Sequence, residues 1–180
     1  MKVETTNIPG LLMIKPEVFS DERGFFLEDY QRDRYVEAGI TADFIQDNHS
    51  HNRRDVLRGL HFTIKTPQVQ LVYVSSGEIF DVAVDLRAKS PSFGCWHGVH
   101  LSAEAPCQVF IPAGFAHGFC GMDNDNLVFY GLTNYRSKKD EVGILWNDKT
   151  LKIKWPTKKP IISSKDKNNI TFEKYKNLYL

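Results

Sequence analysis

The residue types best suited to acid–base chemistry lie in a short apolar segment, Val-Leu-Arg-Gly-Leu-His-Phe, at residues 56–62. His61 can accept or donate a proton near neutral pH, but a histidine in an apolar strand is more often a hydrogen-bonded core residue. Arg58 favours a functional interpretation, because a guanidinium inside a sheet needs an anion beside it. In a regular strand the two side chains would face opposite sides, and Gly59 between them permits a β-bulge that turns both into one pocket.

A second histidine follows a Pro-Gly turn in the string Ile-Pro-Ala-Gly-Phe-Ala-His-Gly-Phe, residues 111–119, which delivers His117 onto the next strand. The spacing P-x-G-x-x-H is like the second half of a metal-binding cupin signature, with His49 and His51 as its first half. However, His51 lies 66 residues before His117, and no glutamate follows it at the usual short interval. A metal-dependent cupin that uses these three histidines therefore stays an alternative, and we expect no metal.

A third polar group lies in Asp-Glu-Arg-Gly-Phe-Phe-Leu-Glu, residues 21–28. The turn presents Arg23, which can bind a phosphate, and the following strand can present Phe26 and Glu28 on one face. An aromatic ring with a carboxylate can stack on a nucleobase and hydrogen-bond it. Surface turns often have the same composition, so this pattern alone is weak.

The elements that must position these residues are mostly short β-strands punctuated by Gly, Pro, Asn and Asp. Two short helices are predicted, one at residues 33–38 before Gly39 and one from Phe172 onward. Many short strands with turns between them indicate an antiparallel sandwich or jelly roll, and no linker divides residues 1–180, so we expect one domain. The clearest strands are residues 56–63, 69–75, 78–86, 96–101, 108–111 and 127–133.

The strand at residues 78–86 has a legible alternation that places Asp81 and Asp85 on one face. Two interpretations remain open. The two carboxylates face solvent, or the sheet has a polar concave face that lines a pocket.

Composition and charge limit the classes of function. The chain has a net charge of +1 and 42% hydrophobic residues, so a nucleic-acid binder, which normally carries a basic excess, is disfavoured. The polar first residues lack the apolar core of a signal peptide, no run approaches a membrane helix, and the three cysteines have no zinc-like spacing. We expect a cytoplasmic protein without nucleic-acid or membrane partners. Residues 149–180 carry nine lysines against Asp166 and Glu173, which indicates a solvated basic surface or a positive rim that attracts an anionic substrate.

Taken together, these strings resemble the dTDP-4-dehydrorhamnose 3,5-epimerase family of nucleotide-4-ketosugar epimerases. The resemblance implies an all-β, cupin-type double-sheet jelly roll without metal or cofactor, usually a homodimer whose strands contribute to the neighbouring subunit. It also implies removal of the protons beside a C4 ketone, at C5 and C3, and their return from the opposite face. The matching strings run in order over residues 19–166: DERGFFLE, QDNHS, VLRGLHF, GEIFDVAVDLR, SPSFGCWHGVHLS, IPAGFAHGF, GILWNDKTLKIKWP and PIISSKD.

The resemblance assigns roles to individual residues. His61 corresponds to the general base, Asp166 to the carboxylate that orients it, and Tyr130 to the acid that reprotonates from the other face. Without the family, Tyr130 would be taken as an aromatic residue of the core. The positions expected around the nucleotide diphosphate and sugar are Arg23, Phe26, Glu28, Gln46, Asn48, Arg58, Gln70, Asp81 and His117.

Two departures from the family pattern bear on specificity. Gln70 stands where the family has a lysine near the ketosugar, and losing a cationic donor to an enolate typically costs about 10²–10³ in rate. The string after Tyr130 also differs, with Gly131 next to it and Arg136 after Tyr135. Inversion at both centres and inversion at one centre of a different nucleotide-ketosugar therefore both stay open.

Two further questions stay open at the level of sequence. The nucleotide is not specified, since thymidine is the family default and relatives use cytidine or guanosine sugars. A catalytically inactive sugar-binding jelly roll is a further alternative, which the joint presence of His61, Asp166 and Tyr130 disfavours.

Overall fold

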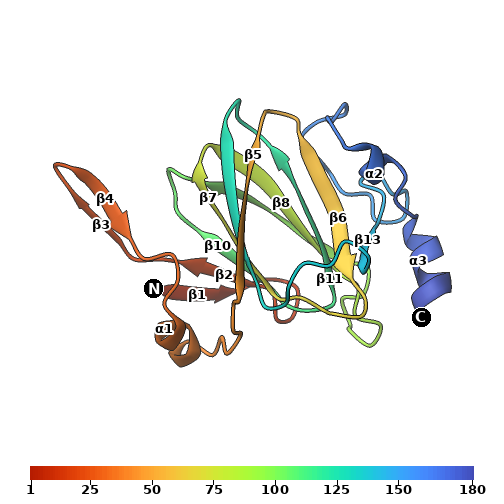
Figure 1. Cartoon of the computed structure of the whole chain (residues 1–180), viewed down its shortest axis with the longest axis horizontal. Helices are drawn as coiled ribbons and strands as arrows, with labels where there is room; N and C mark the ends of the chain where they lie inside the picture. Colours follow the sequence, from red (N-terminus) through yellow and green to blue (C-terminus); the bar gives the residue numbers. More distant parts are fainter.

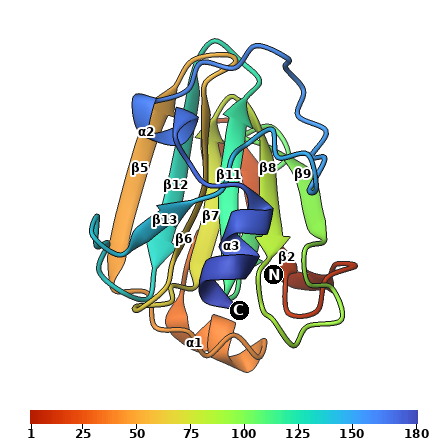
Figure 2. The same ribbon diagram turned by 90° about the vertical axis from the view of Figure 1, so that its right-hand side faces the viewer.

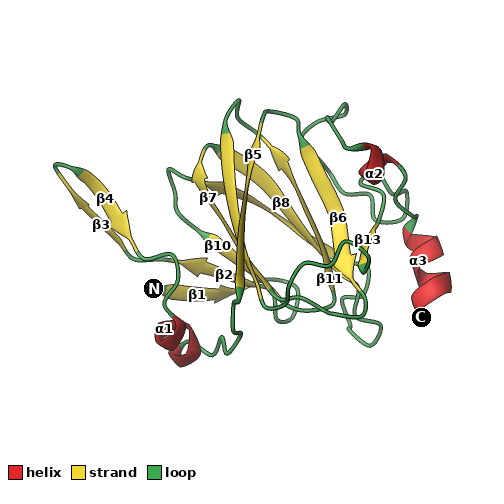
Figure 3. Cartoon of the chain, in the orientation of Figure 1, coloured by secondary structure: helices red, strands yellow, loops and turns green.

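The computed structural model describes all 180 residues, and most of its strands form two antiparallel sheets that face each other (Figure 1). Secondary structure is predominantly β, with three short helices (Figure 3). The six-stranded sheet has the order β1 (Lys2–Thr5), β2 (Leu12–Lys15), β10 (Gln108–Ile111), β7 (Gln70–Ser76), β12 (Asn126–Leu132) and β5 (Gln46–Asn52). The five-stranded sheet has the order β13 (Glu141–Gly143), β6 (Leu57–Thr63), β11 (Phe115–Gly121), β8 (Glu78–Asp85) and β9 (Trp96–Ser102).

The core between the two sheets forms because each strand turns alternate apolar side chains inward. Val72 and Val128 of the six-stranded sheet pack with Ile79, Ala83 and Phe119 of the five-stranded sheet in one buried cluster. This double-sheet arrangement with few helices confirms the predicted all-β, cupin-type jelly roll.

A second core covers the outer face of the five-stranded sheet. Phe172 and Tyr175 of α3 (Phe172–Tyr179) pack with Leu60 and Phe62 of β6 and with Val84 of β8. Figure 2 shows α3 lying across this face. The segment before it carries the one-turn helix α2 (Ser164–Lys167), so packing of α3 fixes the place of α2 beside the end of β6.

Both carboxylates of β8 lie on its inner face, together with Ile79 and Ala83 of the core between the two sheets. They are buried there, so the solvent-facing interpretation of this strand was wrong. Asp81 and Asp85 are 1% and 0% exposed. Asp85 does not line the cavity between the two sheets that is described below. It binds the Arg87 guanidinium, with an Nε–Oδ1 distance of 2.8 Å, and accepts the hydroxyls of Ser90 and Ser92. Burial acts to raise the pKa of Asp85, but these hydrogen bonds outweigh it and hold that pKa at about 2.

A hairpin of β3 (Val18–Asp21) and β4 (Gly24–Leu27) projects from the body of the molecule (Figure 1), and we call residues 18–27 the arm. Its apolar side chains are exposed to an unusual degree, with Phe25 at 60% and Phe26 at 67%. Helix α1 (Arg32–Glu37) follows the arm and packs through Tyr35 on Ile14 of β2. The three helices of the structure are all too short to span a membrane.

Candidate active site

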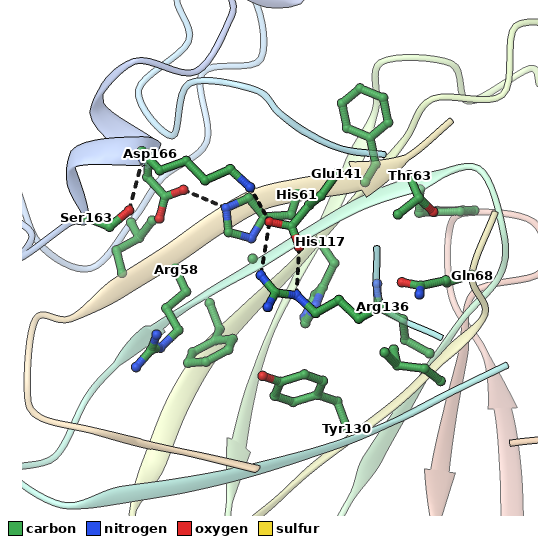
Figure 4. Close-up of a pocket in the computed structure, with 18 of the residues that line it drawn as sticks. Arg58, His61, Thr63, Gln68, His117, Tyr130, Arg136, Glu141, Ser163 and Asp166 are labelled. Atoms are coloured by element: carbon green, nitrogen blue, oxygen red, sulfur yellow. Dashed lines mark hydrogen bonds and ion pairs between the residues drawn. The ribbon is translucent and has the colours of Figure 1, made fainter. Parts of the chain in front are cut away.

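A cavity of about 520 Å³ opens between the two sheets, with walls from β6 and β11 on one side and from β7 and β12 on the other (Figure 4). The loop before β13 and the segment around α2 close it. Six residues singled out from the sequence line it together: Arg58, His61, Gln70, His117, Tyr130 and Asp166.

The β-bulge expected at Gly59 is present, and it explains how two residues three apart on one strand reach the same cavity. His61 pairs with His117, whereas Arg58 pairs with Phe119, so β6 carries one more residue than β11 over this stretch. Gly59 has a φ of +116°, and a Cβ there would lie 2.6 Å from the Cα of Gly118. Only glycine fits that backbone and that close approach.

His61 is held by a buried carboxylate. Its Nε2 lies 2.6 Å from Oδ1 of Asp166, and the Asp166 side chain is 5% exposed. Ser163 caps α2 by accepting the backbone N–H of Asp166 at 3.0 Å, which fixes the carboxylate in place. Burial raises the pKa of Asp166, but the hydrogen bond from His61 outweighs it and leaves that pKa below its usual value. The pair thus fixes the ring with Nε2 toward Asp166 and Nδ1 free for a substrate.

A second histidine–carboxylate pair lies next to the first. His117 Nε2 is 2.7 Å from Oδ2 of Asp81, and both side chains are buried. Because His117 and His61 are register partners on adjacent strands, the two imidazoles share one face of the sheet.

Tyr130 faces these imidazoles from the opposite sheet. It lies on β12, and its ring packs against the core between the sheets while its hydroxyl points into the cavity (Figure 4). The cavity therefore has an imidazole on one wall and a phenol on the other. A general base and a general acid on opposite faces of one substrate require this arrangement.

Three charged residues that the sequence did not single out as a site complete the cavity. Glu141 of β13 binds Arg136, with an Nε–Oε2 distance of 2.9 Å, and also forms an ion pair with Lys165 of α2. Burial raises the pKa of Glu141, but the hydrogen bonds from Lys165 and Arg136 and the nearby His61 lower it below its usual value. No motif joins these residues, so only the topology could reveal them.

Gln46 and Asn48 of β5 do not line the cavity. Gln46 Nε2 donates to Oδ1 of Asn48 at 2.8 Å, and Gln46 Oε1 accepts the backbone N–H of Arg136 at 3.0 Å. Asn48 Nδ2 is buried without a hydrogen-bond partner, which is unusual in a folded protein.

The expected ligand residues Arg23 and Phe26 of the arm, and Glu28 just after it, lie outside this cavity. Arg23 is paired with Asp21 at 2.5 Å on the exposed turn, and Glu28 binds Arg34 at 3.0 Å. Phe26 is exposed and lies beside Phe19 of the neighbouring strand, with ring centroids 6.4 Å apart. Within one chain, the structure does not bring these residues to the cavity.

The histidines of the metal alternative are not gathered either. His51 Nε2 lies 2.5 Å from Asp125 on the surface, and His49 packs on Phe129. His117 lies in the other sheet with Asp81. No three His, Cys, Asp or Glu side chains are grouped as metal ligands would be.

The basic C-terminal part contributes one lysine to the cavity, Lys165. Four others line a separate hollow beside two tryptophans: Lys149, Lys152, Lys154 and Lys158. Of the two interpretations of this basic segment, a positive rim at the cavity is therefore limited to Lys165, with Arg58 and Arg136 from other parts of the chain.

Comparison with known proteins gives full-length matches. The family described as dTDP-4-dehydrorhamnose 3,5-epimerase matches residues 5–174. A dTDP-4-dehydrorhamnose 3,5-epimerase from Shigella flexneri is 48% identical over 174 residues, which cover 96% of each chain. The structure of dTDP-6-deoxy-D-glucose-3,5-epimerase from Legionella pneumophila, in complex with dTDP-4-keto-L-rhamnose, is similar with a TM-score of 0.93 and 42% identity. The similarity covers 99% of this chain and 94% of that one.

Relatives named for inversion at a single centre also match. The dTDP-4-dehydrorhamnose 3-epimerase of Streptomyces niveus is 37% identical over 171 residues, which cover 93% of this chain and 82% of that one. The chain is thus similar to proteins named for inversion at two carbons and to one named for inversion at one carbon.

Proposed function

Since this chain belongs to the dTDP-4-dehydrorhamnose 3,5-epimerase family, we propose that it epimerises a dTDP-linked 4-keto-6-deoxyhexose in deoxysugar biosynthesis. It is an isomerase that inverts C3, C5 or both, beside the C4 ketone. The ketone acidifies the adjacent C–H bonds, so the reaction needs a base, an acid on the other face and a donor to the enolate oxygen. We propose that it proceeds without a cofactor.

We assign the base to His61. Its ring is fixed by Asp166 at 2.6 Å, which sets the tautomer and stabilises the imidazolium formed when the ring takes a proton from carbon. This pair, facing a phenol across one cavity, is the observation that supports the proposal most.

We assign the acid to Tyr130, because its hydroxyl points into the cavity from the sheet opposite His61. A proton removed on one face and returned on the other inverts the carbon. The His117–Asp81 pair lies beside His61 and is suited to hold a sugar hydroxyl.

We further propose that the working unit is a homodimer in which the arm of each chain reaches the cavity of its partner. The exposed phenylalanines of the arm support this, because contiguous apolar surface in a protein generally marks an interface. Arg58 would bind the diphosphate within its own chain. Arg23 and Phe26 would bind the nucleotide from the partner, which would explain why they lie far from the cavity within one chain.

We also propose a cytoplasmic location. The three cysteines are all free, as is usual for a protein in a reducing compartment.

The test is conversion of defined substrates. The protein is incubated with dTDP-4-keto-6-deoxyglucose, and proton couplings around the sugar ring are read by NMR to identify each inverted carbon. Matched GDP- and CDP-linked ketosugars test the nucleotide. Conversion of the dTDP sugar alone, or at much higher kcat/KM, supports the proposal, whereas conversion of none of the three would refute it.

A further inference from the structure

Removal of a proton beside a ketone moves an electron pair onto the ketone oxygen, and an enzyme must stabilise that charge with a well-placed donor. Three permanent cations line the cavity: Arg58, Arg136 and Lys165. The wall positions Gln68 and Gln70 are neutral. One of the three cations is therefore the strongest available donor to the oxygen.

Arg58 and Lys165 are poorly placed for this task. Arg58 Nε is bound to Asn52 at 2.6 Å, and its guanidinium lies at the far end of the cavity from Arg136 (Figure 4). Lys165 projects from α2 and forms an ion pair with Glu141 on the side of Asp166.

Arg136 lies between the two residues assigned to proton transfer. In Figure 4 its guanidinium points into the cavity between the rings of His61 and Tyr130. Glu141, which holds it, also interacts electrostatically with His61, and Arg136 interacts electrostatically with Tyr130. A ketosugar positioned for attack by a base on one wall and an acid on the other has its C4 oxygen in this region, next to both reacting carbons.

The Arg136 guanidinium has N–H groups that Glu141 does not use. Two of its five N–H groups are directed at Glu141, from Nε at 2.9 Å and from Nη2 at 3.3 Å. Three remain for an oxygen in the cavity. Glu141 is 9% exposed, whereas Arg136 is 44% exposed, so a buried carboxylate anchors a guanidinium that substrate can reach.

The backbone of Arg136 is anchored as well. Gln46 Oε1 accepts its N–H at 3.0 Å, so the loop between β12 and β13 is tied to β5 at this residue. Backbone and side chain are thus fixed before substrate binds, as electrostatic stabilisation of a transition state requires.

From this geometry we propose that Arg136 binds the C4 oxygen of the ketosugar and stabilises the enolate during proton transfer, an inference that rests on the proposed function. His61 takes the proton from carbon, and the C–H electron pair forms the C–C double bond while the carbonyl pair moves to the oxygen held by Arg136. Tyr130 then gives its proton to the other face of that carbon, and the carbonyl re-forms. His61 then gives its extra proton to solvent, and the Tyr130 phenolate takes one from solvent, so both return to their starting states.

The test compares Arg136→Gln with wild-type protein by solvent deuterium exchange into dTDP-4-keto-6-deoxyglucose. The exchange rate is expected to fall about 10²–10³-fold. Affinity for dTDP, which lacks the ketone, is expected to stay within about twofold. The matched control is Arg54→Gln, because Arg54 is an exposed arginine paired with Asp123 at 3.4 Å and does not line the cavity. It should exchange at the wild-type rate.

A second variant separates charge from structure. In Gln70→Lys/Arg136→Gln, a cation is returned to the same cavity from β7, and exchange should recover by tenfold or more. Arg136→Lys keeps the positive charge but loses the planar guanidinium, so it should give an intermediate exchange rate. It replaces Arg136→Gln in the test if that variant does not fold. Exchange at the wild-type rate in both Arg136→Gln and Arg136→Lys would refute the role of Arg136. A loss of dTDP affinity that parallels the loss of exchange would refute it as well. An absence of exchange in the wild-type protein would instead overturn the proposed function.

Discussion

His61 can take a proton from a sugar carbon only while its ring is neutral and turned with one nitrogen toward the substrate. The buried Asp166 provides this orientation, at 2.6 Å from Nε2. His61→Ala is therefore expected to abolish deuterium exchange, whereas the affinity for dTDP is expected to stay near that of the wild type. NMR labelling measures the first quantity and calorimetric titration the second.

The matched control is His51→Ala, since His51 is a surface histidine paired with Asp125 and lies outside the cavity. It should leave exchange unchanged. A metal-dependent enzyme using His49, His51 and His117 would lose activity in this variant, so an inactive His51→Ala would contradict the proposed roles.

Asp85 gives a prediction for stability against pH. Its pKa in the fold is about 2, against an ordinary value of 3.8. A lowered carboxylate pKa stabilises the fold fully above the ordinary value, and this contribution is lost as the pH falls through the folded-state pKa. The difference corresponds to about 2 kcal/mol. The measurement is urea unfolding of wild type and Asp85→Asn at pH 6 and near pH 2. The variant should have a lower free energy of unfolding than wild type at pH 6 only. An equal loss of unfolding free energy at both pH values would contradict the assignment.

The bulge in β6 depends on a single residue, Gly59. A methyl group at Gly59 would meet Gly118 Cα at 2.6 Å, and φ there is +116°. Gly59→Ala is expected to cost roughly 3 kcal/mol or more of unfolding free energy and to displace Arg58 from His61. Gly39→Ala is the control, because Gly39 also has a positive φ, +86°, but open space around it. It should cost about 1 kcal/mol, and an equal loss in both variants would contradict the close-approach argument.

The strands of the core could be predicted because their side chains alternate. The expected strand at residues 108–111 coincides with β10, and that at 78–86 exceeds β8 by one residue. β5 was not predicted as a strand, because Gln46–Asn52 is polar throughout and has no apolar face. It forms the sheet edge through backbone pairing with β12, and its side chains are free for hydrogen bonding.

In the site as well, some residues could be predicted from the sequence and others could not. His61, Tyr130 and Asp166 were predicted from a family resemblance, and the fold gathers them at one cavity. Glu141 and Arg136 were not, because ion pairs between a loop, a short edge strand and α2 leave no spacing signal in a sequence. The arm is a different case, since its residues are predicted as ligands and one chain alone does not bring them to the cavity.

At the scale of the whole molecule, the proposed homodimer predicts complementation between inactive chains. His61→Ala lacks the base, and Arg23→Ala lacks the arm contact. A mixed dimer contains one complete cavity, with His61 from one chain and Arg23 from the other. Turnover after mixing and subunit exchange should therefore exceed the sum of the separate preparations. If sedimentation shows mixed dimers but turnover does not rise, each arm would act at the cavity of its own chain.

The dimer interface itself is tested by Phe25→Asp, which should give a folded monomer in sedimentation, because Phe25 is exposed within one chain. Leu178→Asp places the same charge on the exposed side of α3 and should leave the dimer intact. Dimers of equal stability in both variants would contradict an interface at the arm.

The most direct test of the central claim is to incubate the wild-type protein with dTDP-4-keto-6-deoxyglucose in heavy water and read deuterium at each sugar carbon by proton NMR. We predict label beside the ketone, at C3, at C5 or at both, at a rate that depends on His61. Label at both carbons identifies a 3,5-epimerase, and label at one identifies a mono-epimerase. No label at either carbon, with dTDP bound, would contradict proton transfer by the His61–Asp166 pair.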